Sequence, residues 1–306
     1  MDNKLKSEIT TFLLDRGADL IGFAATETWA KEGMVPERYR PDALWPHVNS
    51  VIVIGCQMPL PIVETTPSVQ HRDLYNTCNR MLDDLAFHLS RWLNRHGHAS
   101  IPLSRDGYAN IQTLIRKPGA AFSHVFAAQY AGLGYIGINN TILTKKFGPR
   151  VRFVSVFTEA KIPPDPMLRE GLCIRCGACA DLCPVGALKI SKKALREDVI
   201  ITAQYNRRSC TEWARLLTQR GCYPCGICIK VCPVGEDRGL YERDQTARHY
   251  RREIDTSVTN SPDPFYRSWN HIRNHGSLFF NEDITSDDTL RSIIEKIKNN
   301  MDGREQ

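Results

Sequence analysis

The spacing of hydrophobic residues predicts a mixture of amphipathic helices and buried strands over the first 160 residues. Apolar residues recur at helical spacing over 4–16, and again over Tyr75–Arg95, which is the longest such pattern. Short runs rich in apolar and β-branched residues favour strands instead, and these runs are 20–24, 51–56 and 150–158. Because both element types are mixed along this stretch, we predict an α+β (α/β) domain over residues 1–165.

Composition changes twice further along the chain. Ile162-Pro163-Pro164-Asp165-Pro166 has the composition of a linker, and a cysteine-rich unit follows over 166–240. We expect a C-terminal extension over 241–306, with a basic stretch at 248–252 and a last helix beginning near Ser286. The basic stretch is more typical of a solvated helix face than of a nucleic-acid contact.

Two cysteine runs with one spacing dominate the second unit. Both follow C-x2-C-x2-C-x3-C-P; they are Cys173, Cys176, Cys179, Cys183 with Pro184, and Cys222, Cys225, Cys228, Cys232 with Pro233. This spacing is typical of two-cluster ferredoxins, in which the fourth cysteine of each run ligates the other cluster. Structural zinc sites rarely repeat it. The sequence therefore predicts two [4Fe–4S] clusters and electron transfer.

Length, composition and charge restrict the class of protein and the compartment in which we expect it. The chain has 306 residues, 42% of them hydrophobic, and a formal net charge of +6. It is too long to be a bare ferredoxin, and no apolar run is long enough to span a membrane. With no signal-peptide pattern, clustered cysteines indicate metal ligands in a reducing cytoplasm, so we expect a cytoplasmic protein. The mild charge does not predict nucleic-acid binding.

A glycine-rich run, Gly132–Gly137, matches the dinucleotide-binding pattern G-x-G-x-x-G. That pattern requires a preceding strand and a following helix. Here the preceding residues 120–130 have helical composition, and those that follow are poor helix formers. We therefore predict a loop that lets the backbone approach some other flat cofactor, and not an NAD or FAD site.

The order of these segments resembles the epoxyqueuosine reductase and reductive dehalogenase superfamily over residues 50–235. The matching segments are Ala131–Gly137, Asn139, Gly148–Arg152, Val156–Thr158 and the first cysteine run. The resemblance implies a nitroreductase-like cobalamin-binding domain followed by a double [4Fe–4S] domain, with cobalamin as cofactor and flavin as a less favoured alternative. The cofactor contacts it implies are Gly132, Leu133, Gly134, Tyr135, Gly137, Asn139, Arg150 and Arg152. For the two arginines, a solvated strand face is the alternative.

The resemblance also changes one cluster ligand. It implies one cluster on Cys173, Cys176, Cys179 and Cys232, and a second on Cys183, Cys210, Cys225 and Cys228. Plain ferredoxin spacing uses Cys222 in place of Cys210. The resemblance favours Cys210, but both assignments stay open at this point.

Two positions depart from the pattern of epoxyqueuosine reductases. Pro118 stands where those enzymes have an acidic Asp, and Ile138 stands where they usually have a Lys. Pro118 cannot donate a proton, so tRNA epoxide reduction is not expected. The candidate proton donors are His124, Tyr108 and Asp106. A core or capping role is the alternative for His124, and turn chemistry is the alternative for the other two.

These observations favour an iron–sulfur reductase, with cobalamin, that cleaves a bond in a small organic substrate. The partners we expect are that substrate and an electron donor such as ferredoxin or flavodoxin, with no membrane. A different class of protein stays open: an electron-transfer or reductive-activation protein that passes electrons from its clusters to a partner's cofactor.

Overall fold

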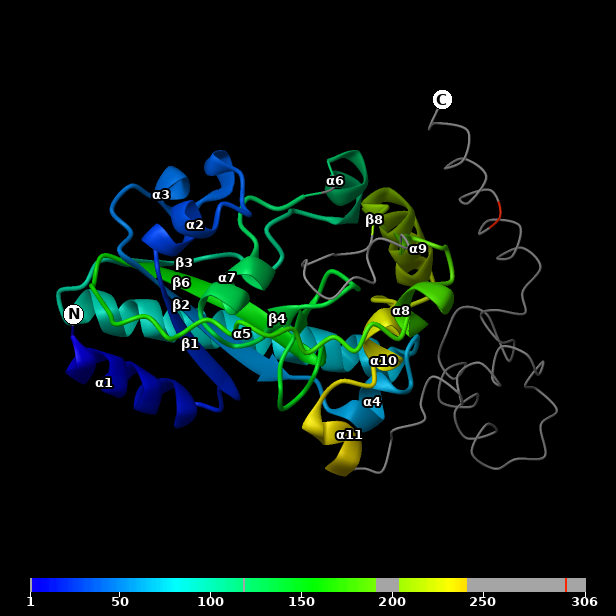
Figure 1. The fold of residues 1–306 in the computed structure, drawn as a ribbon, viewed down its shortest axis with the longest axis horizontal. Coiled ribbons are helices and arrows are strands. Elements are labelled where there is room, and N and C mark those ends of the chain that lie inside the picture. The colour runs from blue at the N-terminus through cyan, green and yellow to red at the C-terminus, as the bar shows by residue number, and fades with distance from the viewer. Residues whose placement is uncertain (1, 118, 191–203, 241–294, 296–306) are drawn as a thin grey trace.

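The computed structural model describes residues 2–117, 119–190, 204–240 and 295 (Figure 1). Its centre is a four-stranded antiparallel sheet with the strand order β1-β2-β6-β3. The strands are β1 (Leu20–Ala25), β2 (Ser50–Gln57), β6 (Val151–Thr158) and β3 (Ser100–Pro102). The three predicted strands are confirmed. The short β3 was missed because it is three residues long and buries only its first residue.

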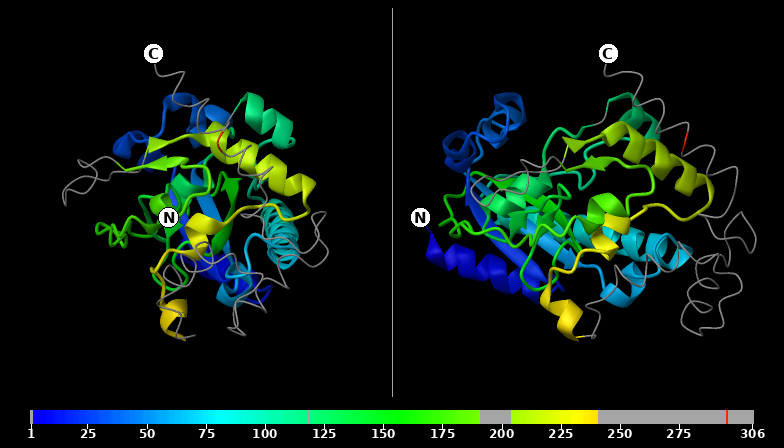
Figure 2. Two further views of the ribbon diagram at one scale, coloured as in Figure 1. Left: turned by 90° about the vertical axis from the view of Figure 1, so that its right-hand side faces the viewer. Right: turned by 45° about the vertical axis from the view of Figure 1, so that its right-hand side comes forward.

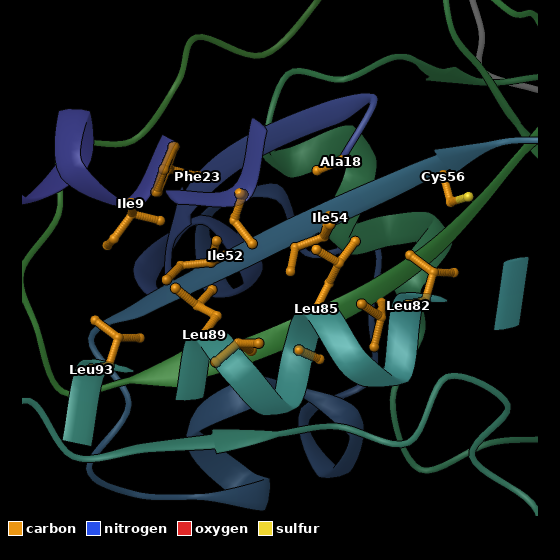
Figure 3. Close-up of a cluster of buried hydrophobic side chains, with 14 of the residues drawn as sticks. Ile9, Ala18, Phe23, Ile52, Ile54, Cys56, Leu82, Leu85, Leu89 and Leu93 are labelled. Atoms are coloured by element: carbon orange, nitrogen blue, oxygen red, sulfur yellow. The ribbon is translucent and has the colours of Figure 1, made fainter. Parts of the chain in front are cut away.

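Two long helices cover one face of the sheet, α1 (Asn3–Leu14) and α5 (Val69–Arg95). Ile9 of α1 and the leucines of α5 meet Ile52 and Ile54 of β2 in one core, which Figure 3 shows. Both predicted helices are confirmed, although α5 begins six residues before the predicted start. Cys56 and Cys78 are buried in this same core.

Short helices cover the opposite face around Trp29. This side holds α2 (Glu27–Glu32) and α7 (His124–Tyr130), and the alternate residues Val51 and Val53 of β2 point into it. Because successive strand residues face opposite sides, β2 is buried on both faces, as its apolar run predicts. The other short elements of the first 143 residues are η1 (Glu37–Tyr39), α3 (Pro41–Leu44), α4 (Leu60–Val63), α6 (Ile111–Arg116), β4 (Tyr135–Ile136) and β5 (Ile142–Leu143).

The cysteine-rich segment lies beyond one end of the sheet (Figures 1 and 2). Its elements are α8 (Ala178–Asp181), β7 (Leu188–Lys189), β8 (Gln204–Tyr205), α9 (Arg207–Gln219), α10 (Ile227–Lys230) and α11 (Glu236–Leu240). The helix α9 packs against α6, and α10 packs against α8 and α4. The segment therefore contacts the sheet-containing part through several elements.

The segment predicted as a linker is packed against the first part of the chain. Asp165 accepts hydrogen bonds from Lys6 Nζ (2.6 Å) and from the Phe23 backbone N–H (2.9 Å). Ile162 is buried in the core, and its N–H donates to Ser50 Oγ (3.0 Å). A proline-rich composition thus marks an extended strap here.

A buried ion pair joins the sheet to the end of the cysteine segment. The Arg150 guanidinium, fully buried, contacts the Asp237 carboxylate at 2.5 and 2.6 Å. It also donates to the carbonyl oxygens of Cys232 (3.2 Å) and Val234 (2.7 Å). Close backbone packing accompanies this pair, because a side chain on Gly148 would collide with the Val234 carbonyl.

The predicted C-terminal extension, its basic stretch and its last helix lie outside the described residues, apart from Glu295. Among the residues that the structure describes, no helix is both long and apolar enough to cross a bilayer. The division at residue 165 stays a prediction.

Removal of the Arg150 charge tests the importance of this ion pair. We expect Arg150→Met to lower the free energy of unfolding by about 3–5 kcal/mol, because the Asp237 carboxylate would stay buried without a partner. Lys145→Met is the control, since Lys145 is 83% exposed and lies 3.8 Å from Glu236; it should cost at most about 1 kcal/mol. Anaerobic urea unfolding measures both, and equal losses would contradict the prediction.

Candidate redox site

The cysteines form two groups in space. Burial, followed by the neighbouring thiols of Cys232, Cys176 and Cys173, raises the pKa of Cys179 to about 12. Cys228 lies in a second group, because burial and then the thiols of Cys210, Cys225 and Cys183 raise its pKa well above the ordinary value. Thiols with such values are protonated at neutral pH, so iron must displace their protons when a cluster binds.

Each group is built on a glycine turn followed by one turn of helix. Gly177 (φ 77°) precedes α8 and Gly226 (φ 67°) precedes α10, and both adopt the left-handed conformation that glycine tolerates best. The turn reverses the chain between the second and third cysteines of a run. The side chains of Ala178 and Ile227 then pack the two short helices together, so the two groups lie side by side.

The positions of Cys210 and Cys222 differ. Cys210, near the start of α9, contributes to the raised pKa of both Cys225 and Cys228. Cys222 is fully buried and its thiol donates to the Arg220 carbonyl (3.5 Å). This arrangement supports the ligand set with Cys210, which the resemblance implies, while the ligand set itself stays a prediction.

Solvent access also differs around the site. Cys176 is exposed, whereas Cys179 and Cys232 are buried. Within residues 2–117, 119–190 and 204–240, no three Cys, His, Asp or Glu side chains converge tightly enough to hold a single metal ion. Two four-iron clusters need their thiolates set around a larger centre, so the grouped cysteines fit that cofactor better.

The glycine-rich run makes its close contacts with the protein itself. A side chain on Gly132 would collide with the Pro166 carbonyl, and one on Gly134 with the Leu143 carbonyl. Gly137 donates to Thr141 O (2.8 Å), and Asn139 Oδ1 accepts from the Thr141 N–H (3.2 Å). The run follows helix α7 and contains β4, which forms a hairpin with β5. It therefore lacks the preceding strand and following helix of a dinucleotide site.

The other members of the predicted cofactor loop are also held by neighbouring residues. Tyr135 lies beside Gly171, and Leu133 lies beside Gly22. Close packing within the protein therefore accounts for the absence of side chains at these glycines. The predicted approach of a flat cofactor is not needed to explain it. Arg150 is likewise engaged internally by Asp237 and backbone carbonyls, and its contact with a cofactor stays a prediction.

His124 is also held on both ring nitrogens. Nε2 lies 3.0 Å from the Ser104 carbonyl, which can only accept, so Nε2 carries the proton. Nδ1 then accepts from Ser155 Oγ at 2.9 Å. Burial lowers the pKa of His124 to about 4. At neutral pH the ring is neutral and its one proton is held by the Ser104 carbonyl, so the role of His124 as an acid stays a prediction that these contacts do not favour.

Asp106, Tyr108 and Arg152 come together at the sheet end. Arg152 donates to Asp106 Oδ1 (2.8 Å) and to Asn79 Oδ1 (3.1 Å). The Tyr108 hydroxyl lies 3.2 Å from that of Tyr223, a residue of the cysteine segment. Burial raises the pKa of Tyr108, while Arg152 opposes that shift. We call Tyr75, Asp106, Tyr108, Arg152 and Tyr223 the tyrosine cluster.

Sequence reasoning missed two members of the tyrosine cluster. Tyr75 of α5 donates to Asp106 Oδ1 (3.3 Å), and its ring packs edge-on against Tyr223 at 5.7 Å. The Arg152 guanidinium stacks over Tyr75 at 4.3 Å. The position of Tyr223 inside the second cysteine run was the one available signal, since a tyrosine there must lie near a cluster.

Comparisons with known proteins agree with this architecture. The 4Fe-4S double cluster binding domain family matches residues 172–235. A tetrachloroethene reductive dehalogenase of Desulfitobacterium hafniense is 27% identical over 147 residues, which are 47% of this chain and 24% of that protein. The epoxyqueuosine reductase of Bacillus subtilis is 22% identical over 215 residues, 60% of this chain and 52% of the relative. The chain thus matches only a quarter to a half of these relatives' lengths.

Solved structures share the fold. A catabolic reductive dehalogenase in complex with 3-bromo-4-hydroxybenzoic acid superposes with a TM-score of 0.57 and 19% identity, over 81% of this chain and 36% of that one. Epoxyqueuosine reductase from Streptococcus thermophilus gives 0.50 and 15% identity, over 87% of this chain and 88% of that one.

The fold and the cysteine groups define an α+β protein with a double 4Fe–4S cluster-binding domain. Over larger parts of its length the chain is similar to epoxyqueuosine reductases and reductive dehalogenases, and its residues 172–235 match the double cluster family. None of these comparisons supports flavin, and the expectation against a nucleic-acid partner stays a prediction.

Serine substitutions distinguish Cys210 from Cys222 as the eighth ligand. We expect Cys210→Ser to lose or convert one cluster, because its thiol lies with those of Cys225 and Cys228. Cys222→Ser is the matched control and should keep about eight iron atoms per chain, the content of two [4Fe–4S] clusters. Iron and sulfide assays with EPR after anaerobic reconstitution measure both. Cluster loss in Cys222→Ser alone would show that plain ferredoxin spacing sets the ligands.

The half-buried, neutral His124 predicts a pH dependence of stability. Its pKa is about 4 in the folded protein and 6.5 ordinarily, so between these values the unfolded chain binds a proton that the folded chain does not. Stability is therefore lost as pH falls from about 6.5 towards 4. His124→Asn should remove about 2 kcal/mol of this loss between pH 7 and 4.5.

Urea unfolding of wild type, His124→Asn and the exposed-site control His88→Asn, each at both pH values, gives the comparison. The control should follow wild type, so acid damage common to all three proteins cancels. Equal losses in wild type and His124→Asn would contradict the assignment.

Proposed function

We propose that this protein is a reductase that moves electrons through two [4Fe–4S] clusters and delivers them, with a proton, to a small organic substrate beside the tyrosine cluster. One observation carries the proposal. Tyr223 belongs to the tyrosine cluster, and it packs against the same small buried core around Trp213 as Cys183, Cys210 and Cys225 of the second cysteine group. The proposed proton source would therefore lie near the proposed electron source.

Electron entry is proposed at the first cysteine group. Cys176 is exposed there, so a small donor protein such as a ferredoxin or flavodoxin could approach this cluster closely. The cluster of the second group would then receive these electrons and pass them to the substrate beside the tyrosine cluster.

Proton supply is assigned to Tyr108, with Tyr223 as its hydrogen-bond partner. A raised pKa keeps the Tyr108 phenol protonated at neutral pH, and so able to donate. Arg152, which pairs with Asp106, stabilises negative charge that develops on the phenol oxygen during donation. Asp106 is then a positioning residue, because its carboxylate accepts from Arg152 and from Tyr75.

Cobalamin is part of this proposal, and its support is the relationship to reductive dehalogenases, one of which is described as B12-dependent. When bound, a corrinoid supplies low-valent cobalt that can cleave carbon–halogen or carbon–oxygen bonds. The predicted glycine loop does not fit as its cradle, because the loop is closed on its own backbone. Arg152 is the predicted contact that still lies beside the proposed site.

A second candidate function is electron transfer to a partner's cofactor. The closed glycine loop favours it, as does the replacement of the family's acid by Pro118, which lies outside the described residues. In that case the tyrosine cluster would serve only to hold the two parts of the chain together.

The proposal is tested with anaerobic, cluster-loaded protein and added cob(II)alamin. We expect the EPR spectrum to change to that of base-off cobalamin. With reduced methyl viologen as donor and 3-bromo-4-hydroxybenzoic acid as a test halide, Tyr108→Phe should keep the base-off signal and slow reduction by on the order of 100- to 10,000-fold. Tyr39→Phe, on the opposite side of the sheet, is the matched control.

Each readout separates the two functions. An unchanged cob(II)alamin spectrum would contradict corrinoid binding and favour electron transfer to a partner. Full turnover in Tyr108→Phe would contradict the proton role, even if the cofactor binds.

A further inference from the structure

A buried indole N–H lies beside the second cysteine group without a conventional partner. Trp213 of α9 is 1% exposed, and its Nε1 has no hydrogen-bond acceptor in the part of the chain that the structure describes. The buried core that contains Trp213 also packs against Cys183, Cys210 and Cys225. A buried donor left without an acceptor is costly, so an acceptor at this point is expected.

Cys225 is the cysteine of this group that lies close enough to receive this N–H once a cluster binds. Burial raises the pKa of Cys225, and the Trp213 side chain opposes that shift. Cys225 is a cluster ligand in both of the ligand assignments considered above, so the contact does not depend on the choice between Cys210 and Cys222. Once a cluster binds, this sulfur is a permanent thiolate and a stronger acceptor.

A further donor reaches the same group, since the Ala187 N–H donates to Cys183 Sγ (3.2 Å). Burial raises the pKa of Cys210, and the Tyr205 hydroxyl opposes that shift. Hydrogen bonds to the sulfurs are one of the factors that set the reduction potential of an iron–sulfur cluster. Reduction adds negative charge to the cluster, so a donor stabilises the reduced state more than the oxidised one.

We propose that Trp213 tunes the cluster of the second cysteine group by donating its indole N–H to the Cys225 thiolate, which raises the reduction potential of that cluster. An electron that enters at the cluster beside the exposed Cys176 would then be drawn to this second cluster. The inference needs only that clusters bind, and it holds whether the protein turns over a substrate or reduces a partner.

The direct test is a potentiometric titration of the cluster-loaded protein, in which EPR measures the reduced fraction of each cluster. In Trp213→Phe, the equilibrium constant for reduction of one cluster should fall at least about tenfold, which is a shift of about 59 mV to more negative potential for a one-electron couple. The other cluster should keep its potential. Trp29→Phe is the matched control, since Trp29 is equally buried but lies across the sheet in the α2 and α7 core, and it should change neither potential.

A second measurement covers the case in which Trp213→Phe loses a cluster. Wild type with 15N-labelled tryptophan should show a 15N hyperfine coupling to one reduced cluster in pulsed EPR. The coupling should persist in Trp29→Phe and in Trp269→Phe, which removes a tryptophan outside the described residues. The proposal would be overturned if Trp213→Phe keeps both clusters and both potentials stay unchanged. It would also be overturned if wild type shows no 15N coupling, or if the coupling is lost in Trp269→Phe.

Discussion

The buried guanidinium of Arg150 is the constraint on which the arrangement of the two parts of the chain depends. A fully buried cation must be paired, and here every partner comes from residues 229–237. The last cysteine of the second run therefore lies against the first residues of β6. Because Cys232 is shared between the sheet contact and the first cysteine group, the position of the clusters is tied to the sheet itself.

A second buried ion pair lies beside Cys232, close to Arg150. Arg238, 3% exposed, donates to the Cys232 carbonyl (3.1 Å) and pairs with Glu64 (3.3 Å). Burial raises the pKa of Cys232 to about 11, and Arg150 opposes that shift. An anionic cluster on this thiolate would balance cations that are otherwise held in a dry interior. The surroundings of the cysteines thus suit a negatively charged cofactor at this end of the sheet.

The elements with a strong local pattern were predictable from the sequence, and the site was predictable only in part. Periodicity located β1, β2, β6, α1 and most of α5, and cysteine spacing located the double cluster domain. The first turns of α5 were missed because they are polar and begin at a Ser68 cap, whose Oγ accepts from the His71 N–H. The surroundings of Arg150, His124 and the glycine run were not predictable, for a different reason. Each is set by tertiary contacts, with Asp237, Ser104 and Leu143, that no local pattern encodes.

The choice of proton donor follows from these same contacts. A residue can donate at neutral pH only if it keeps its proton there and is not committed to another acceptor. His124 fails on both counts, and the Asp106 carboxylate is committed to Arg152 and Tyr75. Tyr108 meets the first condition because burial raises its pKa further above neutral, and its hydrogen-bond partner is another hydroxyl, which can rotate to accept or donate. In the reductase proposed above, a phenol is thus the group best suited to supply the proton.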